Sequence, residues 1–375
     1  MPPSSLRIPP LLQPYIKGLP QGSLHLLTSV LGASANWLLI RYICGALGEI
    51  QPANSRRAND QDGTTTGLEG DDTAVVLVSF LRDWDFWKTE ARRAAGLDLA
   101  RLAQQNRFIF VDGLSSLFLP SEPEDGPSRA TTTGPAQAPN AALPIRGPRT
   151  VNPRGQPIPT QASIPQPKTT ASPSPIINLT SATLEHLEST LSTAFASISA
   201  QGRRIHLLVD SPDLLLAATA SAASSAAITP STLNATILSL RAQVHAVTVA
   251  VAADAPLMGA AADASAFAAG IGSTKQHTPL ETSHASLVLS LAHVADWMLS
   301  LRLLDTGFAA DVSGVVRITR GDNEDEDDQE EGQEAEESWQ KEENKREEKE
   351  LLYHVAGDGG VKVFERGSGG GAGHG

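Results

Sequence analysis

Five short apolar runs recur along this chain, and each is bounded by polar residues. They are Ser23–Val30, Thr73–Phe80, Arg107–Asp112, Arg204–Asp210 and Val244–Ala252. Thr73–Phe80 (TAVVLVSF) is apolar without alternation, which is typical of a strand buried on both faces. The intervening segments have room for helices, which we expect at residues 35–47, 84–105, 179–200 and 231–243. This alternation predicts an α/β fold, a mostly parallel sheet flanked by helices.

The last part of the chain has strand patterns with no helix between them. These are Ala295–Leu304, Val312–Thr319, Leu351–Ala356 and Val361–Glu365. The run LLYHVAGDGGVKVFERG turns at Gly357–Gly360, which is typical of a hairpin. We therefore expect an antiparallel C-terminal extension of the sheet.

Three segments lack an apolar period. Pro120–Pro175 holds 14 of the 25 prolines, Gly321–Glu350 holds 16 Asp and Glu against 4 Lys and Arg, and Gly48–Asp72 is polar and rich in Gly and Thr. Such segments bury too little apolar surface to offset the entropy of ordering them. We predict one domain over residues 1–366 with disordered inserts at these three places, and a flexible Gly-rich tail over 367–375.

The net charge of −13 is almost wholly local to the acidic insert. Outside Gly321–Glu350 there are 26 acidic and 25 basic residues, a net of −1, so bulk charge neither predicts nor excludes a nucleic-acid partner. The single cysteine, Cys44, is consistent with a reducing compartment and a buried thiol. No stretch has the roughly 20 strongly apolar residues of a membrane span. We expect a cytoplasmic protein with no membrane partner, with the nucleus as an additional compartment.

The loop after the first predicted strand stands where P-loop proteins bind phosphate. There a glycine-rich loop cradles phosphates, a Lys reaches the β- and γ-phosphates, and a Ser or Thr binds magnesium. Here the loop is VLGASANW, with one glycine at Gly32, Ser34 behind it, and Asn36 about where the lysine would be. Without the lysine and the hydroxyl, the γ-phosphate and the metal lack their ligands. We interpret this as a degenerate P-loop, with a chance strand–helix junction as the alternative.

A second strand ends where a magnesium-linked aspartate would stand. Arg204–Asp210 (RIHLLVD) is apolar and finishes in Asp210, a Walker-B-like position. Strands ending in Asp are common, and the simpler interpretation is that Asp210 caps the following turn. No HExxH pair, GxSxG elbow or GxGxxG loop after a strand is present, so the sequence predicts no catalytic residue, metal site or cofactor.

Two segments are candidates for contacts with other molecules. Arg82, Trp84, Phe86 and Trp87 lie together after a buried strand, either as a helix packed on the sheet or as an interface, where Trp, Phe and Arg are favoured anchors. The second is a predicted hairpin. Its candidate interface residues are Asp305, Gly307, Phe308, Asp311 and Gly314, and Arg302 and Arg317 are candidate contacts to tRNA or to a neighbour's nucleotide site.

Together these blocks resemble the Elongator complex protein 6 family. The resemblance runs in order through the altered loop near Gly32, VVLVSFLRDWDFWKTEARRAAGLDL, RFIFVDGLSSLF, IHLLVD, LRLLDTGFAADVSGVVRITRG and LLYHVAGDGGVKVFERG. The LDTG…DVSG hairpin and the VSF…W block are its most specific parts. The proline-rich and acidic inserts fall outside it.

The resemblance implies a RecA-like fold without working Walker motifs and without enzymatic activity. It implies a subunit that forms a heterohexameric ring with Elongator subunits 4 and 5. That ring joins the remaining Elongator subunits, binds tRNA and supports wobble-uridine modification. The alternatives are an active RecA-like ATPase of the recombination type, and an unrelated α/β interaction module acting through its acidic insert.

Overall fold

The computed structural model describes residues 8–47, 73–118, 176–220, 227–268, 276–305, 307, 309, 311–321 and 346–366. The segments 48–72, 120–175 and 322–345 and the tail 367–375, on which the predicted disorder falls, lie outside these residues. All the described residues belong to one compact unit, residues 1–120 and 175–375.

The described strands form one ten-stranded sheet. Their bounds are β1 Ser23–Ser29, β2 Thr73–Ser79, β3 Phe108–Asp112, β4 Ile176–Asn178, β5 Arg204–Asp210, β6 Ala246–Ala252, β7 Trp297–Arg302, β8 Gly314–Arg320, β9 Lys349–Val355 and β10 Val361–Glu365. They are arranged in the order β10-β9-β8-β7-β1-β6-β5-β2-β3-β4.

The pairing of the strands changes once across the sheet, from parallel to antiparallel. β7, β1, β6, β5, β2, β3 and β4 are parallel to one another, whereas β8, β9 and β10 pair antiparallel. The α/β class, the mostly parallel sheet and the antiparallel C-terminal part are confirmed. Because β5 and β6 separate β1 from β2, the order is neither the Rossmann nor the flavodoxin order, in which the first two strands are neighbours.

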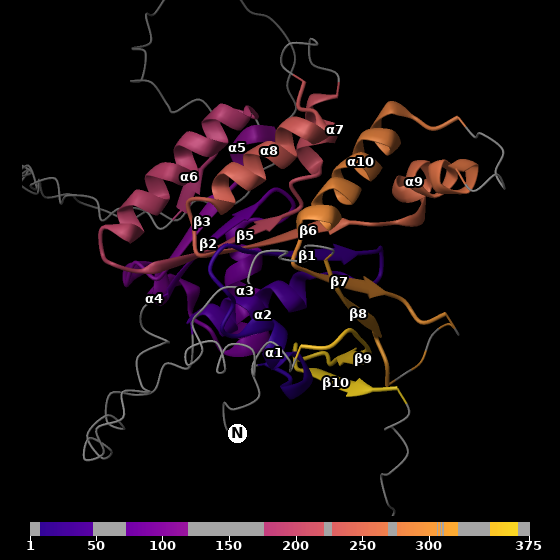
Figure 1. The fold of residues 1–375 in the computed structure, drawn as a ribbon. Helices are drawn as coiled ribbons and strands as arrows, with labels where there is room; N and C mark the ends of the chain where they lie inside the picture. Colours follow the sequence, from indigo (N-terminus) through magenta and orange to yellow (C-terminus); the bar gives the residue numbers. More distant parts are fainter. Residues whose placement is uncertain are drawn as a thin grey trace, which may run out of the picture. The chain divides into compact units, whose positions relative to one another are not determined.

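Helices cover both faces of the parallel part (Figure 1). Their bounds are η2 Pro10–Leu12, α1 Gln13–Ile16, α2 Asn36–Leu47, α3 Trp84–Ala95, α4 Leu99–Gln104, α5 Ser115–Phe118, α6 Leu184–Ser199, α7 Leu214–Thr219, α8 Pro230–Arg241, α9 Ala255–Ala268 and α10 Pro279–Val294. Figure 1 shows α2 and α3 on one side of the sheet and α6, α8 and α10 on the other. None of the described helices combines the length and apolar character that a bilayer crossing requires.

The sequence sets several helix starts through capping side chains. Thr229 and Thr278 begin α8 and α10 with reciprocal capping boxes, and each is followed by a proline at the first helical position. Thr183 caps α6 by accepting the His186 N–H. These caps satisfy N–H groups that a helix leaves without an internal partner.

Four predictions about local structure need correction. The single helix expected over residues 84–105 is two, because Gly96 adopts φ +62° and ends α3. The helix expected from residue 179 begins at Leu184, after the short strand β4. Residues 349–350, assigned to the acidic insert, already belong to β9. The helices α9 and α10, between β6 and β7, were not predicted.

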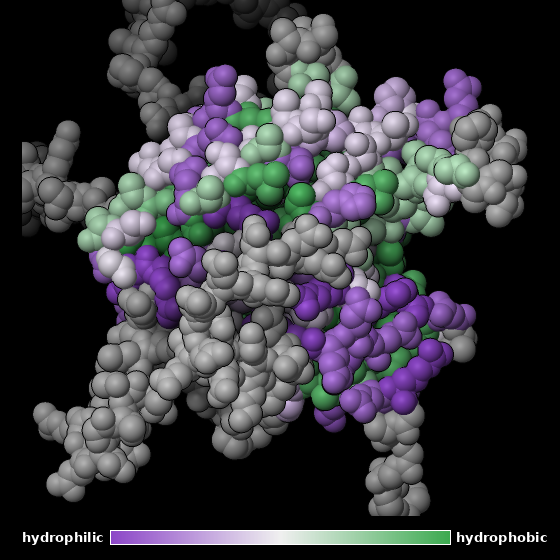
Figure 2. All heavy atoms as spheres, viewed as in Figure 1, coloured by the Kyte–Doolittle hydropathy of each residue, from purple (hydrophilic) through white to green (hydrophobic). Residues whose placement is uncertain are grey.

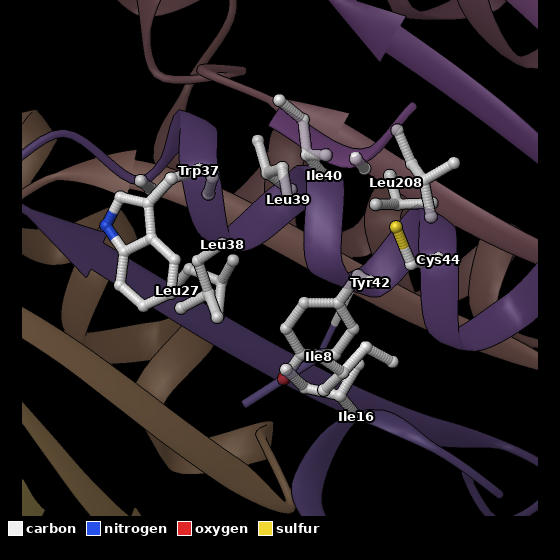
Figure 3. Close-up of a cluster of buried hydrophobic side chains, with 14 of the residues drawn as sticks. Ile8, Ile16, Leu27, Trp37, Leu38, Leu39, Ile40, Tyr42, Cys44 and Leu208 are labelled. Carbon is white, nitrogen blue, oxygen red and sulfur yellow. The ribbon is translucent and has the colours of Figure 1, made fainter. Parts of the chain in front are cut away.

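Two apolar clusters form the core, one on each face of the sheet. Alternate residues of the strands divide between them, so that Val75 and Leu77 face α2 and α3 whereas Val76 and Val78 face α6 and α8. Figure 3 shows the first cluster beneath α2, where Trp37 and Cys44 pack among aliphatic side chains. The double coverage explains why these strands are apolar without alternation.

Buried polar residues also face α2. His25 Nδ1 lies 2.8 Å from Tyr42 Oη, and His206 Nε2 lies 2.9 Å from Thr248 Oγ1. Burial lowers the pKa of both histidines to about 3, so both are neutral in the folded protein at physiological pH.

Candidate functional site

The loop after β1 forms a tight turn at the carboxyl edge of the sheet. The Ala33 N–H donates to the Val30 carbonyl at 2.8 Å, and Gly32 adopts φ +92°. A turn of this kind bonds N–H groups within the loop instead of pointing them at a ligand.

Both neighbouring strands contact this loop. The Leu31 N–H donates to Asp254 Oδ1 at 2.7 Å. Asp254 lies two residues after the end of β6. On the other side a Cβ at Gly32 would lie 3.4 Å from the Leu303 side chain, just after β7. An N–H group that could face a phosphate thus already binds a carboxylate of its own chain.

Helix α2 begins directly behind the turn. Ser34 Oγ accepts the Asn36 N–H at 3.3 Å, and the Ala35 carbonyl accepts the N–H groups of Leu38 and Leu39. Trp37 is buried, with its ring 4.9 Å from that of Tyr353 on β9. The first residues of α2 are therefore a neutral polar residue, Asn36, and a core aromatic, Trp37.

An open hollow of about 290 Å³ lies beside the start of α2. Loop residues 32–34, the start of α2, α3 and the β9–β10 hairpin line it. Its charged members, Arg93 and Glu90, pair with each other at 2.6 Å. The hollow is at the lower end of the size of small-molecule sites, about 300 Å³ upward.

Asp210 ends β5 at the same edge, with β6 between it and the loop. The residue is buried, and its carboxylate accepts the Ser79 hydroxyl at 2.7 Å and the Ser211 hydroxyl at 3.2 Å. Burial raises the pKa of Asp210 to about 6, against the opposing effect of these hydrogen bonds. Its recorded donors are hydroxyls and not the backbone N–H groups that a capping aspartate binds.

A buried Asp–His contact beside Asp210 was missed by the sequence reasoning. Asp213 Oδ2 lies 3.7 Å from His284 Nδ1, and His284 Nε2 lies 2.9 Å from the Ala252 carbonyl. The contact links the start of α7, the end of β6 and helix α10. Burial raises the pKa of Asp213, whereas His284 opposes this shift. The only local signal was the histidine itself, in a Leu- and Ser-rich helix that also carries His293.

The Trp-rich block divides between core and surface. Trp87 is fully buried, and half-buried Trp84 packs on Phe108 and Phe110 of β3. Phe86 is half-buried, with the Arg82 guanidinium 5.0 Å from its ring centre. Within this block Arg82 and Phe86 are therefore better placed than Trp87 to meet another molecule.

The predicted hairpin after β7 is present, closed by a bridge between Ala309 and Val312. Arg302 pairs with Asp305 at 2.7 Å and with Glu350 of β9 at 3.0 Å. Gly307 adopts φ +91°, while a Cβ at Gly314 would lie 2.6 Å from the Arg302 carbonyl.

The other members of that candidate set differ in accessibility. Asp311 and Arg317 are exposed, and Phe308 lies outside the described residues. The hairpin is thus held at its base, whereas charged groups remain at its surface.

The described residues contain no group of three or more His, Cys, Asp or Glu side chains arranged to hold a metal ion. A scan against models of protein families finds no match, and a search of curated proteins finds none that is significantly similar. The function therefore has to be argued from the sequence blocks and from this edge of the sheet.

Proposed function

We propose that this chain is a RecA-like, non-catalytic subunit of the Elongator complex. In this proposal it assembles with Elongator subunits 4 and 5 into a heterohexameric ring. The ring joins the remaining Elongator subunits, binds tRNA and supports modification of its wobble uridines.

The contact between the Leu31 N–H and Asp254 Oδ1 is the observation that carries the non-catalytic part. A nucleotide phosphate placed at this loop would meet the charge of that carboxylate. Two like charges 4 Å apart repel by about 1 kcal/mol in water and about 4 kcal/mol at an effective dielectric constant of 20. No lysine stands in Val30–Trp37 to offset that repulsion.

The environment of Asp210 supports the same proposal. A magnesium ion bound through this carboxylate would compete with the hydroxyl donors of Ser79 and Ser211. The strand, loop and helix are present at this edge of the sheet. The Leu31 N–H binds Asp254, and the Asp210 carboxylate binds Ser79 and Ser211. Such a strand–loop–helix frame is suited to assembly.

Accessible parts of the Trp-rich block supply a contact surface for that assembly. Arg82 and Phe86 flank the start of α3, and Leu81 beside them is 40% exposed. Arg and aromatic side chains are favoured anchors in the cores of protein interfaces.

Co-expression with Elongator subunits 4 and 5 tests the proposal. We expect the full chain to co-purify with both at stoichiometric ratio, at the mass of a heterohexamer by light scattering. The Phe86→Ala variant should weaken co-purification, whereas Lys88→Ala, an exposed residue of the same helix, should not. A chain that remains a monomer and retains neither subunit would refute the proposal.

Titration of the isolated chain with ATP and Mg²⁺ tests the non-catalytic part. We expect no binding heat for the natural chain or for Asp254→Ala, because removing the carboxylate restores no lysine. Micromolar ATP binding by the natural chain would favour the ATPase alternative. If deletion of residues 322–345 alone abolished co-purification, the acidic-module alternative would replace the ring.

A further inference from the structure

The antiparallel end of the sheet has one face that no described helix covers. The residues of β8–β10 that point to the opposite face, such as Val316, Ile318 and Tyr353, pack in the core cluster on the α2 side of the sheet. Figure 1 shows no helix on the outer side of β8, β9 and β10, and Figure 2 shows mostly hydrophilic side chains over this region. We call this face the open face. Its members are Ser300, Arg302, Val315, Arg317, Thr319, Glu350, Leu352, His354, Lys362, Phe364 and Arg366.

The strand register orders the open face into rows. One row runs across the strands through Arg302, Val315, Leu352 and Phe364, because these residues are cross-strand partners. Val315 is buried, and Leu352 and Phe364 are half-buried, so the row is an apolar strip with an aromatic ring at the sheet edge.

Cations lie on both sides of the strip. Arg317 of β8 is in the row on one side and Lys362 of β10 in the row on the other, each about 7 Å from the strip. Arg366 follows β10 in the same row as Arg317, and Arg302 stands at the β7 end of the strip.

The balance of charge on the open face is positive. Four Arg and Lys side chains share this face with one carboxylate of its strands, Glu350, which pairs with Arg302 and Arg366, while Asp305, just beyond β7, also pairs with Arg302. Arg317 and Lys362 are exposed, and among the described residues no carboxylate is recorded within 4.0 Å of either. Two cations are thus available to an anionic ligand.

We propose that the open face binds single-stranded RNA. Phosphates would contact Arg317 and Lys362 on either side of the strip, and one base would stack on Phe364. Flat sheets that combine cations with an aromatic side chain bind unpaired nucleic acid in this manner, since every base has a stacking face. The choice of RNA over DNA rests on the proposed function, whereas the surface is assigned by its own charge and register.

Fluorescence anisotropy of a labelled 12-nucleotide single-stranded RNA with the isolated full-length chain tests this inference. The two phosphate contacts, to Arg317 and Lys362, predict a slope of log K against log salt of about −1.4. The double variant Arg317→Gln/Lys362→Gln should bind about tenfold more weakly and reduce that slope by about 1.4. Phe364→Ala should also bind about tenfold more weakly, because a stacked base is lost.

The matched control removes two exposed cations from α3. Lys88→Gln/Arg92→Gln changes the net charge equally and should keep the natural affinity, and thermal melts should show that all variants fold. Equal losses in both double variants, or equal affinity for DNA of the same sequence, would overturn the inference. Assembly with subunits 4 and 5 without RNA binding by this chain would contradict this inference alone. RNA binding without assembly would contradict the proposed ring alone.

Discussion

The parallel and antiparallel parts of this sheet differ in how many of their faces are buried. Every residue of β2 after Thr73 is buried, whereas half-buried and buried residues alternate over Glu350–His354 of β9. Helices cover the first on both faces, and the extension formed by β8–β10 is covered on one. The covered part has polar groups that bind one another at its carboxyl edge, and the half-covered part presents charge to solvent. Stability and contact with other molecules are thereby separated.

The sharpest test of this difference compares one leucine from each part. Leu77 of β2 is fully buried, so Leu77→Ala should lower the free energy of unfolding by about 3 kcal/mol through lost burial and the cavity left behind. Leu352→Ala on the open face should lower it by less than about 1 kcal/mol. Urea titrations measure both. Equal losses would show that the open face is covered in solution.

The next test addresses the contact between the two parts. Gly359, in the β9–β10 turn, adopts φ +82°, and a Cβ there would lie 2.8 Å from the Ala94 Cα of α3. Its carbonyl also accepts Arg41 Nη2 at 3.0 Å. Gly359→Ala should therefore destabilise the protein by about 2 kcal/mol, through backbone strain and displacement of the hairpin from α3.

Gly357 in the same turn is the matched control for that variant. Nothing lies within 4 Å of a Cβ placed there. Gly357→Ala should change stability by less than about 0.5 kcal/mol in thermal melts. If both glycines tolerated alanine, the extension would not depend on its contact with α3.

A smaller effect should appear as a pH dependence of the parallel part. The folded pKa of His206 is about 3 against an ordinary 6.5, so between these values the unfolded chain binds more protons. Stability should therefore fall as the pH drops below about 6.5, by about 1.4 kcal/mol per pH unit from this residue. The His206→Gln variant lacks this titration. Between pH 6.5 and 5 the free energy of unfolding of the wild type should therefore fall by about 2 kcal/mol more than that of the variant.

Unfolding midpoints across a pH series measure this difference, with His293→Gln, an exposed position on α10, as the control. His25 is common to all three proteins, and burial, the largest cause of its lowered pKa, is present in each. Parallel pH profiles for wild type and His206→Gln would contradict the buried, neutral state assigned to His206.

Much of the fold followed from local patterns. The bounds of β1, β2 and β5 lie within a residue of the apolar runs. Buried strands consist of apolar residues, so their extent can be seen in the sequence. Gly96 stands within residues 84–105, where one helix was expected, and a glycine is a common helix stop. The Asp83 and Asp98 caps agree with two helices instead of one.

The candidate site was predictable only in part. The absence of a lysine from Val30–Trp37 could be seen in the sequence, and so could the position of Asp210 at the end of a strand. The Asp254 contact with Leu31 could not, because it joins residues far apart in the chain that meet only when β6 lies beside β1. Asp213 and His284 escaped prediction for the same reason.

The sequence by itself therefore determined most of the strands, the antiparallel pairing at the C-terminal end of the sheet, and the absence of a lysine from the loop Val30–Trp37. The tertiary structure decided what fills that loop and which face of the extension stays open. Periodicity records how deeply each residue is buried but not against what, and that choice depends on the order in which the strands assemble.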